Sequence, residues 1–158
     1  MTIIDILAVL TVLAQIFILL YILPFKKKWM DMVRKNNLKI AFAVALTATL
    51  GSLYLSEIAH FTPCDLCWFQ RIFMYPQVII LGIAILKKDK NVKRYVLPLN
   101  IAGIIVSAYH NYIQITNTTC SVGSVSCLTN YVFKFGYVTI PMMAFTAFLL
   151  IIVLLYKK

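Results

Sequence analysis

Two cysteines, Cys64 and Cys67, are separated by two residues in a run that begins at Pro63 and reads Pro-Cys-Asp-Leu-Cys-Trp-Phe-Gln-Arg. The Cys-x-x-Cys spacing lowers thiol pKa and favours thiol–disulfide exchange. Arg71 follows Cys67 by four residues, one helical turn, so its guanidinium and a helix N-terminus can both stabilise a thiolate at Cys67. The stretch predicts a redox centre, with a metal site or a structural disulfide as alternatives.

A second pair, Cys120 and Cys127, flanks the small residues Ser-Val-Gly-Ser-Val-Ser, which suits a disulfide offered to another protein. Two structural disulfides are the simplest alternative in an oxidising compartment, but a bridge that closes only two residues removes little loop entropy. Zinc needs four thiolates that converge on one ion, and the second spacing is wide for that. We therefore expect redox activity at all four cysteines and no metal.

The composition places these cysteines in a membrane protein. Of the 158 residues, 62% are hydrophobic and 13% are charged, whereas soluble domains are about a quarter charged. The net charge of +10 lies in short clusters between apolar runs. Nucleic-acid binding would instead need basic residues along one face, so the clusters indicate membrane topology.

Five apolar runs are long enough to cross a bilayer as helices. They cover about residues 3–23, 40–56, 69–86, 95–115 and 136–156. We predict an all-α membrane protein of one domain, residues 1–158, with a four-helix transmembrane bundle and one extra N-terminal transmembrane helix. The loops at 57–68 and 116–135 then carry the cysteine pairs.

Basic residues predict the orientation. Thirteen of the fifteen Lys and Arg residues fall in the loops after the first and third spans and at the C-terminus. The positive-inside rule puts these segments in the cytoplasm, with the N-terminus and all four cysteines outside. The first helix could instead lie on the membrane surface. The segment at 131–135, Tyr-Val-Phe-Lys-Phe, is expected along the outer surface, where it would hold the second cysteine loop near the first pair.

One face of the fourth span is polar and must look into the bundle, because polar groups facing lipid are costly. Its members are Asn100, Gly103, Ser107, His110 and Gln114. His110 could bond to another helix or to a carbonyl ligand at the depth of Arg71. Arg71 could bind such a ligand or simply extend to the water interface.

The run Pro63-Cys64-x-x-Cys67-x-x-Gln70-Arg71 at the start of a membrane helix resembles the disulfide bond formation protein B family (DsbB, with the shorter BdbC-type members). The resemblance covers roughly residues 38–156. It implies a four-helix quinone reductase of the cell membrane that reoxidises an extracytoplasmic thioredoxin-like thiol oxidase of the DsbA or BdbD type, soluble or anchored. The electron acceptor implied is a quinone, menaquinone or ubiquinone.

The resemblance also implies roles for single residues. Cys120 resembles the cysteine that the partner attacks, and Cys127 its mate, which exchanges with Cys64. Cys67 resembles the thiolate that contacts the quinone beside Arg71. The redox disulfides are then Cys64–Cys67 and Cys120–Cys127, and His110 matches a histidine near the quinone. Candidate walls of that site, from depth and face, are Ser52, Tyr54, Arg71, Tyr75, Ser107 and His110.

Two departures and two alternatives accompany the resemblance. The first span has no place in a four-helix pattern, and the spacing from Cys120 to Cys127 is short. A vitamin K epoxide reductase-like enzyme also uses two outer cysteine pairs, but its Cys-x-x-Cys comes late in the chain rather than early. A non-enzymatic membrane scaffold with inert disulfides is the alternative from another class.

Overall fold

The computed structural model of the chain describes residues 3–22, 33, 35–89, 91–117, 127–128 and 131–156. Within these ranges the chain is all-helical, and an isolated bridge between Lys134 and Val138 is the one β-type pairing. The helices are α1 (Ile3–Ile22), α3 (Asn37–Leu53) with the π-helical turn η1 (Tyr54–Ile58), α4 (Asp65–Lys87), α5 (Lys93–Thr116) and α6 (Ile140–Tyr156).

Four of these helices are long and apolar enough to cross a membrane, namely α1, α3 with η1, α4 and α5. Helix α6 is as apolar but has 17 residues. Large apolar side chains on the outside of the bundle are exposed, among them Leu19, Ile79, Leu86 and Ile115. Such a surface suits lipid rather than water. The extra N-terminal helix predicted from the sequence is present, and four of the five predicted spans are long enough to cross a bilayer.

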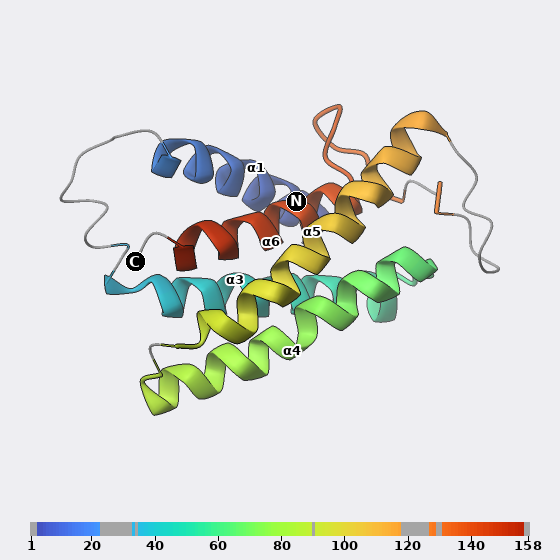
Figure 1. Cartoon of the computed structure of the whole chain (residues 1–158). Coiled ribbons are helices and arrows are strands. Elements are labelled where there is room, and N and C mark those ends of the chain that lie inside the picture. The colour runs from blue at the N-terminus through green and yellow to red at the C-terminus, as the bar shows by residue number, and fades with distance from the viewer. Residues whose placement is uncertain are drawn as a thin grey trace.

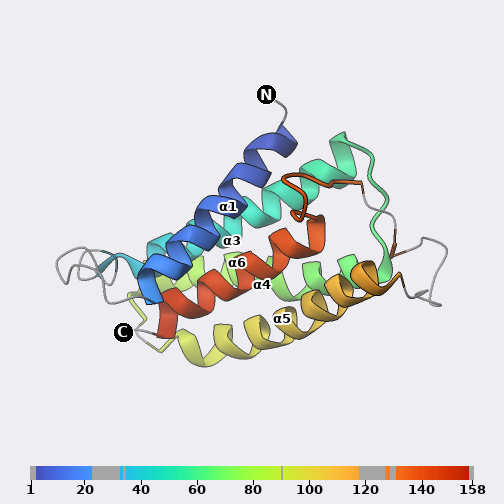
Figure 2. The ribbon, with the colours of Figure 1, turned by 90° about the horizontal axis from the view of Figure 1, so that it is seen from above.

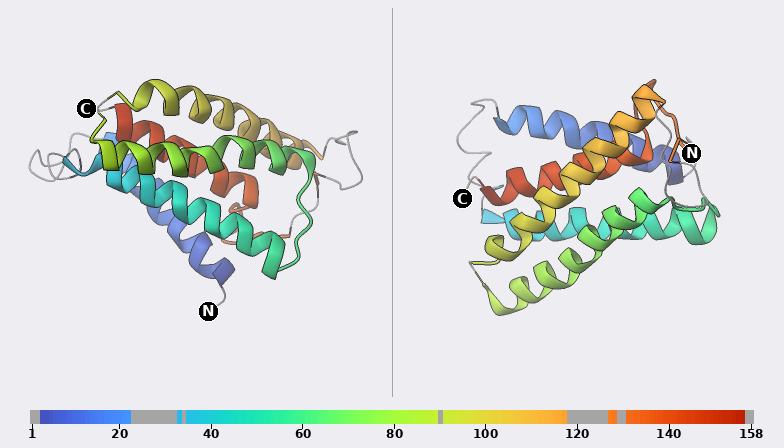
Figure 3. Two further views of the ribbon diagram at one scale, coloured as in Figure 1. Left: turned by 90° about the horizontal axis from the view of Figure 1, so that it is seen from below. Right: turned by 45° about the vertical axis from the view of Figure 1, so that its right-hand side comes forward.

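Helices α3, α4, α5 and α6 form a ring in which each helix packs on its neighbours in the order α4–α3–α6–α5–α4. Helix α1 lies outside this ring and packs on α6 (Figures 1 and 2). The start of α1, the connection from α3 to α4 and the start of α6 lie at one end of the bundle, and the end of α6 lies at the other (Figure 3). The first cysteine pair is thus at the end where α1 begins.

The polar face of α5 points into the bundle, as predicted. Asn100, Gly103, Ser107 and His110 are all buried. Gly103 allows close packing against α6, because a Cβ atom there would lie 2.4 Å from the ring of Phe148. Two of these side chains contact polar side chains of α4. The Asn100 amide donates a 2.9 Å hydrogen bond to Gln77 Oε1, and His110 Nδ1 lies 3.3 Å from Gln70 Nε2.

Two helices begin at positions that differ from the expected ones. Helix α4 begins at Asp65 rather than near 69, because Cys64 takes an extended N-cap conformation after Pro63 and Asp65 complements the helix N-terminus. Cys67 therefore lies inside the first turn of a helix and not in a loop. Helix α6 begins at Ile140 rather than 136, because Phe135 and Gly136 have positive φ angles and form a turn.

The segment before α6 contacts both α1 and the residues that precede α4. Tyr131 stacks on Phe61, with ring centroids 4.8 Å apart, and so ties this segment to the residues just before Cys64. The Lys134 ammonium lies 2.9 Å from the Asp5 carboxylate in α1. The aromatic rings of Phe133 and Phe135 are exposed. The expected placement of the segment along the membrane surface stays a prediction.

Candidate redox site

The Cys64 and Cys67 thiols meet at the N-terminus of α4. Cys64 is the N-cap and Cys67 lies in the first turn, and their sulfur atoms are 3.2 Å apart. A disulfide bond is about 2.05 Å long, so the pair stands as a dithiol in contact. Cys64 is buried and Cys67 is partly exposed. The two cysteines therefore differ in access although only two residues separate them.

The surroundings of Cys64 favour its thiolate form. The hydrogen bond from the Cys67 thiol is the largest cause that lowers the pKa of Cys64 to about 3, and His110 lowers it further, against the opposite effect of burial. The sequence analysis placed a stabilised thiolate at Cys67, and that role stays a prediction. Stabilising the reduced form makes the corresponding disulfide a stronger oxidant. The Cys64–Cys67 disulfide should therefore accept electrons readily.

His110 links the first cysteine pair to Cys127. Its Nε2 atom lies 3.2 Å from the Cys127 carbonyl oxygen and 3.9 Å from Cys64 Sγ, and its Nδ1 atom lies 3.3 Å from Gln70 Nε2. A carbonyl oxygen can only accept, so Nε2 carries a proton, and in the neutral ring Nδ1 accepts from the Gln70 amide. Gln70 thus fixes the tautomer in which His110 donates towards Cys127 and Cys64.

Cys127 is seated against the first pair. It is 1% exposed and forms one small buried cluster with Cys64 and Ile113. Besides the bond from His110, its carbonyl oxygen accepts a 3.4 Å hydrogen bond from the Gln114 amide. Two side chains of α5 therefore position Cys127 beside Cys64. Cys120 lies outside the described residues, so its predicted pairing with Cys127 stays a prediction.

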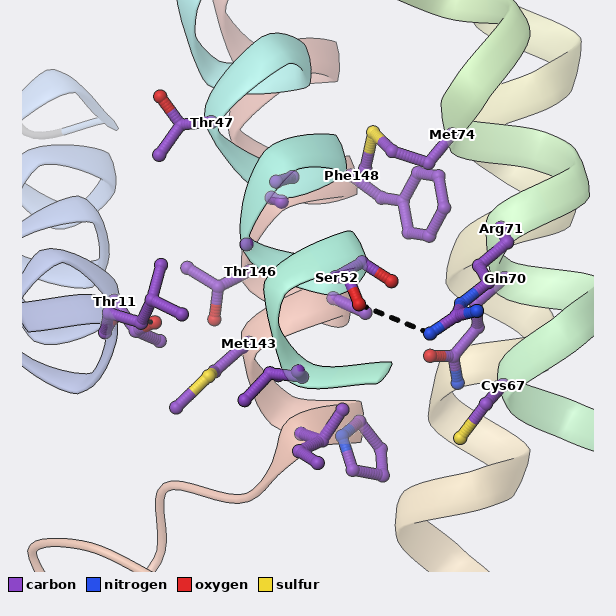
Figure 4. A pocket seen from close by; sticks show the side chains of 18 of the residues that line it. Thr11, Thr47, Ser52, Cys67, Gln70, Arg71, Met74, Met143, Thr146 and Phe148 are labelled. Carbon is purple, nitrogen blue, oxygen red and sulfur yellow. Dashed lines mark hydrogen bonds between the residues drawn. The ribbon is translucent and has the colours of Figure 1, made fainter. Parts of the chain in front are cut away.

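Arg71 lies one turn along α4 and points towards α3. Its Nη2 atom donates a 3.2 Å hydrogen bond to the Ser52 carbonyl oxygen (Figure 4). The guanidinium lies 5.2 Å from the centre of the Trp68 ring. The neighbouring hydroxyls of Tyr75 and Ser52 are 3.3 Å apart. Arg71 is thus held by α3 and an aromatic face and does not simply extend away from the bundle.

A cavity of about 500 Å³ begins beside these groups. Cys64, Cys67, Gln70, Arg71 and Cys127 are among its lining residues. Of the six walls predicted for a quinone site, four line it: Ser52, Arg71, Tyr75 and His110. Tyr54 and Ser107 are not among its lining residues.

The cavity fits a lipid quinone. Its wall is largely apolar, and Figure 4 shows Arg71, Gln70 and Cys67 together on the α4 side of it, where Arg71 is a donor near the Cys67 thiol. Gln114 also lines the cavity, and its buried Oε1 atom has no hydrogen-bond partner among the described residues. A carbonyl ring with an apolar tail matches this distribution.

Cys64, Cys67 and His110 are less suited to binding a metal ion than to thiol chemistry. The ligand atoms of Cys64, Cys67 and His110 lie within 4.8 Å of one another, a spacing that one ion could bridge. Both ring nitrogens of His110 already have partners, in Gln70 and the Cys127 carbonyl. Metal binding would break one of these bonds, so the geometry favours thiol chemistry.

Two features of the site were missed by sequence reasoning. Gln70 was noted only as part of the motif, and its contact with His110 joins residues 40 positions apart. Helix α1 was given no role, yet its residues Leu7, Leu10, Thr11 and Phe17 line the cavity. An apolar helix carries little information about which of its faces packs, so no local signal could have revealed the second feature.

Comparison with known proteins agrees with the chemistry of the site. The family model described as "Disulfide bond formation protein DsbB" matches residues 34–156. The chain is 48% identical over 131 residues to "Probable disulfide formation protein C 2" of Bacillus anthracis, which covers 80% of this chain and 93% of that protein. It is 48% identical over 126 residues to "Disulfide bond formation protein C" of Bacillus subtilis, covering 75% and 91%.

A third relative, "SPbeta prophage-derived disulfide bond formation protein B" of Bacillus subtilis, is 43% identical over 120 residues, 74% of this chain and 81% of its own. No solved structure matches the chain significantly. The family match begins after α1 and includes the first cysteine pair, Cys127 and all four helices of the ring. The chain therefore belongs to the DsbB family, and it is a multi-pass membrane thiol–disulfide oxidoreductase that forms disulfide bonds.

Proposed function

We propose that the protein reoxidises an extracytoplasmic thioredoxin-like thiol oxidase and passes the electrons to a membrane quinone. The observation that carries this proposal is that Cys127 and the apolar cavity both adjoin the Cys64–Cys67 pair. Buried Cys127 packs with Cys64, and Cys67 lies beside Cys64 on the wall of an apolar cavity. A thiol donor on one side and a lipid-sized site on the other give electrons a path through the first pair.

The exchange steps balance in atoms and electrons. The partner's two thiols reduce the Cys120–Cys127 disulfide, and the partner leaves as a disulfide. The Cys127 thiolate then attacks Cys64 Sγ, the Cys64–Cys67 bond breaks, and Cys67 leaves as a thiolate. Attack of Cys120 on Cys127 restores the second disulfide and releases Cys64. Two electrons and two protons now reside on the first pair.

The chain's residues would hold the quinone at the polar end of the cavity. Arg71 is fixed by the Ser52 carbonyl and can offer its remaining N–H donors to a carbonyl oxygen. A quinone bound there supplies a two-electron, two-proton acceptor. Both cysteines of the first pair line the cavity, and Cys64 also packs with Cys127 in a small buried cluster. Cys64 would therefore exchange with Cys127, and Cys67 would face the quinone.

The proposed orientation puts the end where α1 begins outside the cytoplasmic membrane. Basic residues after the first and third spans support it through the positive-inside rule. The cysteine pairs then face the oxidising compartment in which a thiol oxidase works. Cysteine labelling with a membrane-impermeant reagent in intact cells tests this, and labelling of Cys67 only after lysis would overturn the orientation.

A reconstituted assay tests the function. Purified protein, a reduced thioredoxin-like oxidase and a quinone should give partner disulfide and quinol in equal amounts. Cys67→Ser should stop quinone reduction, while Cys127→Ser should trap the partner on Cys120 as a mixed disulfide. If wild-type protein reduces no quinone in the presence of a partner that it does oxidise, the proposal fails.

A further inference from the structure

The cavity extends well beyond the groups that could hold a quinone ring. Along α3 its lining runs from Ser52, which bonds to Arg71, down to Ile40. At 1.5 Å per residue these twelve positions span about 18 Å. The wall along this length is apolar or small, and among its members are Val44, Ala48 and Gly51. The site thus continues into a long groove that no thiol chemistry requires.

Helix α1 forms the opposite side of the groove. Leu10, Ala14 and Phe17 line it from α1, and α6 contributes Ala147 and Leu150. Figure 4 shows Thr11 of α1 at one side of the cavity, with Cys67, Gln70 and Arg71 of α4 at the other and side chains of α3 and α6 between them. Without α1 this face of α3 and α6 would lie open, because α1 is the only described helix outside the ring.

Polar contacts fix α1 in this place. Gln15 donates a 3.1 Å hydrogen bond to the Thr146 hydroxyl of α6 and accepts a 2.7 Å bond from the Tyr137 hydroxyl. Near the helix start Asp5 pairs with Lys134 at 2.9 Å. A polar group in lipid that loses its partner cannot turn to water instead, so these bonds hold α1 at a set rotation. Its lining residues therefore face the groove consistently.

We propose that α1 converts this face of the bundle into a binding groove for the isoprenoid tail of the quinone. The inference rests on the proposed function and adds the tail as a recognised part of the substrate. Three observations select this occupant. The groove is continuous with the ring site at Arg71, it is apolar, and its length matches a tail of several isoprene units rather than a ring alone.

The groove is partly open along its side. Leu10 and Leu13 line the cavity yet are 44% and 55% exposed, and the exposed residue Thr47 faces them from α3. A tail can therefore enter sideways from the bilayer rather than thread from one end. Close to the ring site the passage narrows, because the Leu7 side chain lies 3.0 Å from where a Cβ atom of Gly51 would be.

Paired substitutions test the role of each wall. Leu10→Trp in α1 and Thr47→Trp in α3 fill the groove, whereas Leu19→Trp and Leu50→Trp place the same side chain at exposed positions of the same helices that do not line it. The measurement is kcat/KM for two quinones with the same ring, one with a long isoprenoid tail and one without a tail, in detergent with a reduced partner.

Wild-type protein should prefer the tailed quinone, and each groove-filling variant should lower the ratio of the two kcat/KM values by about tenfold, which corresponds to about 1.4 kcal/mol of binding. The lipid-facing variants should keep the ratio. Equal rates for both quinones in wild type, or an unchanged ratio in the groove-filling variants, overturns the inference. The inference is also overturned if a phospholipid copurifies with wild-type protein and is lost in Leu10→Trp while kcat/KM for the tailed quinone stays unchanged.

Failure of the proposed function and failure of the tail groove give different results in this assay. If the proposed function is wrong, wild-type protein reduces neither quinone, whatever its tail. If only the tail groove is wrong, wild-type protein reduces both quinones with the same preference as the Trp variants. Gln15→Leu supplies an independent arm, since it removes the bonds to Thr146 and Tyr137 without filling the groove. It should lower the preference for the tailed quinone partway, and a preference equal to that of wild type counts against α1 as the wall.

Discussion

The protonation state of Cys64 gives the sharpest test of the redox site. In the reduced pair the Cys64 and Cys67 sulfur atoms lie 3.2 Å apart, and their hydrogen bond is the largest cause of the low pKa of Cys64. A hydrogen bond to a charged group is worth about 1.5–3 kcal/mol. One pH unit of pKa corresponds to about 1.36 kcal/mol. Cys67→Ala should therefore raise the pKa of Cys64 by about 1 to 2 pH units.

Cys67→Ser is the matched control, because its hydroxyl keeps a donor at the same position. Its Cys64 pKa should stay closer to that of the wild-type pair. The assay is the rate of Cys64 alkylation as a function of pH, in chains that also carry Cys120→Ala and Cys127→Ala, with thiolate absorbance as a second readout. Equal pKa values in the Ala and Ser variants would refute the hydrogen-bond explanation and leave burial and His110 to account for the anion.

The same pKa has a stability consequence with a definite sign. A thiolate that is favoured in the folded state stabilises that state fully above the ordinary thiol pKa, and this contribution is lost as the pH falls through the folded value. For Cys64 the window runs from about pH 9 down to about pH 3. Reduced protein should therefore lose stability against heat across this window faster than the Cys64→Ala variant does.

Three further predictions concern single contacts. Arg71→Ala should raise the KM for quinone about tenfold, a loss of about 1.4 kcal/mol, without slowing exchange between the cysteine pairs, as stopped-flow assays of each half-reaction would detect; an unchanged KM would mean that Arg71 serves only α3. Gly103→Ala should destabilise the bundle by about 1–3 kcal/mol by overpacking, because its Cβ would lie 2.4 Å from Phe148, and Phe148→Leu should restore part of the loss in a thermal assay. Asn100→Leu should cost about 1–3 kcal/mol by leaving Gln77 Oε1 buried without its donor, and adding Gln77→Leu should recover stability; additive losses would contradict the pairing.

The spacing of polar and apolar residues predicted much of the bundle, because a bilayer forces polar side chains to face other helices. The inward face of α5 followed from the spacing of Asn100, Gly103, Ser107 and His110 alone, since polar groups in a bilayer have few other places to go. The start of α4 was placed too late because a Cys-x-x-Cys run suggests a loop, whereas Cys64 caps the helix. Helix starts depend on the backbone conformation of one residue, and composition does not specify that.

Contacts between helices could not be predicted from the sequence. The meeting of Gln70 with His110 depends on the rotation of α4 against α5 and not on any spacing within either helix. The lowered pKa of Cys64 depends on its hydrogen bond with Cys67, which requires the two sulfur positions. The role of α1 required its rotation about its own axis, and this is set by Gln15 with partners more than a hundred positions away.

The two polar pairs between α4 and α5 also bear on how the protein assembles. Gln77 with Asn100 and Gln70 with His110 lie along one antiparallel seam, two turns apart on α4. In the bilayer a slip of either helix by one residue would separate both pairs at once, with no water to replace them. The α4–α5 hairpin can therefore find its register by itself soon after insertion. The same register sets His110 where its Nε2 atom can donate to the Cys127 carbonyl oxygen.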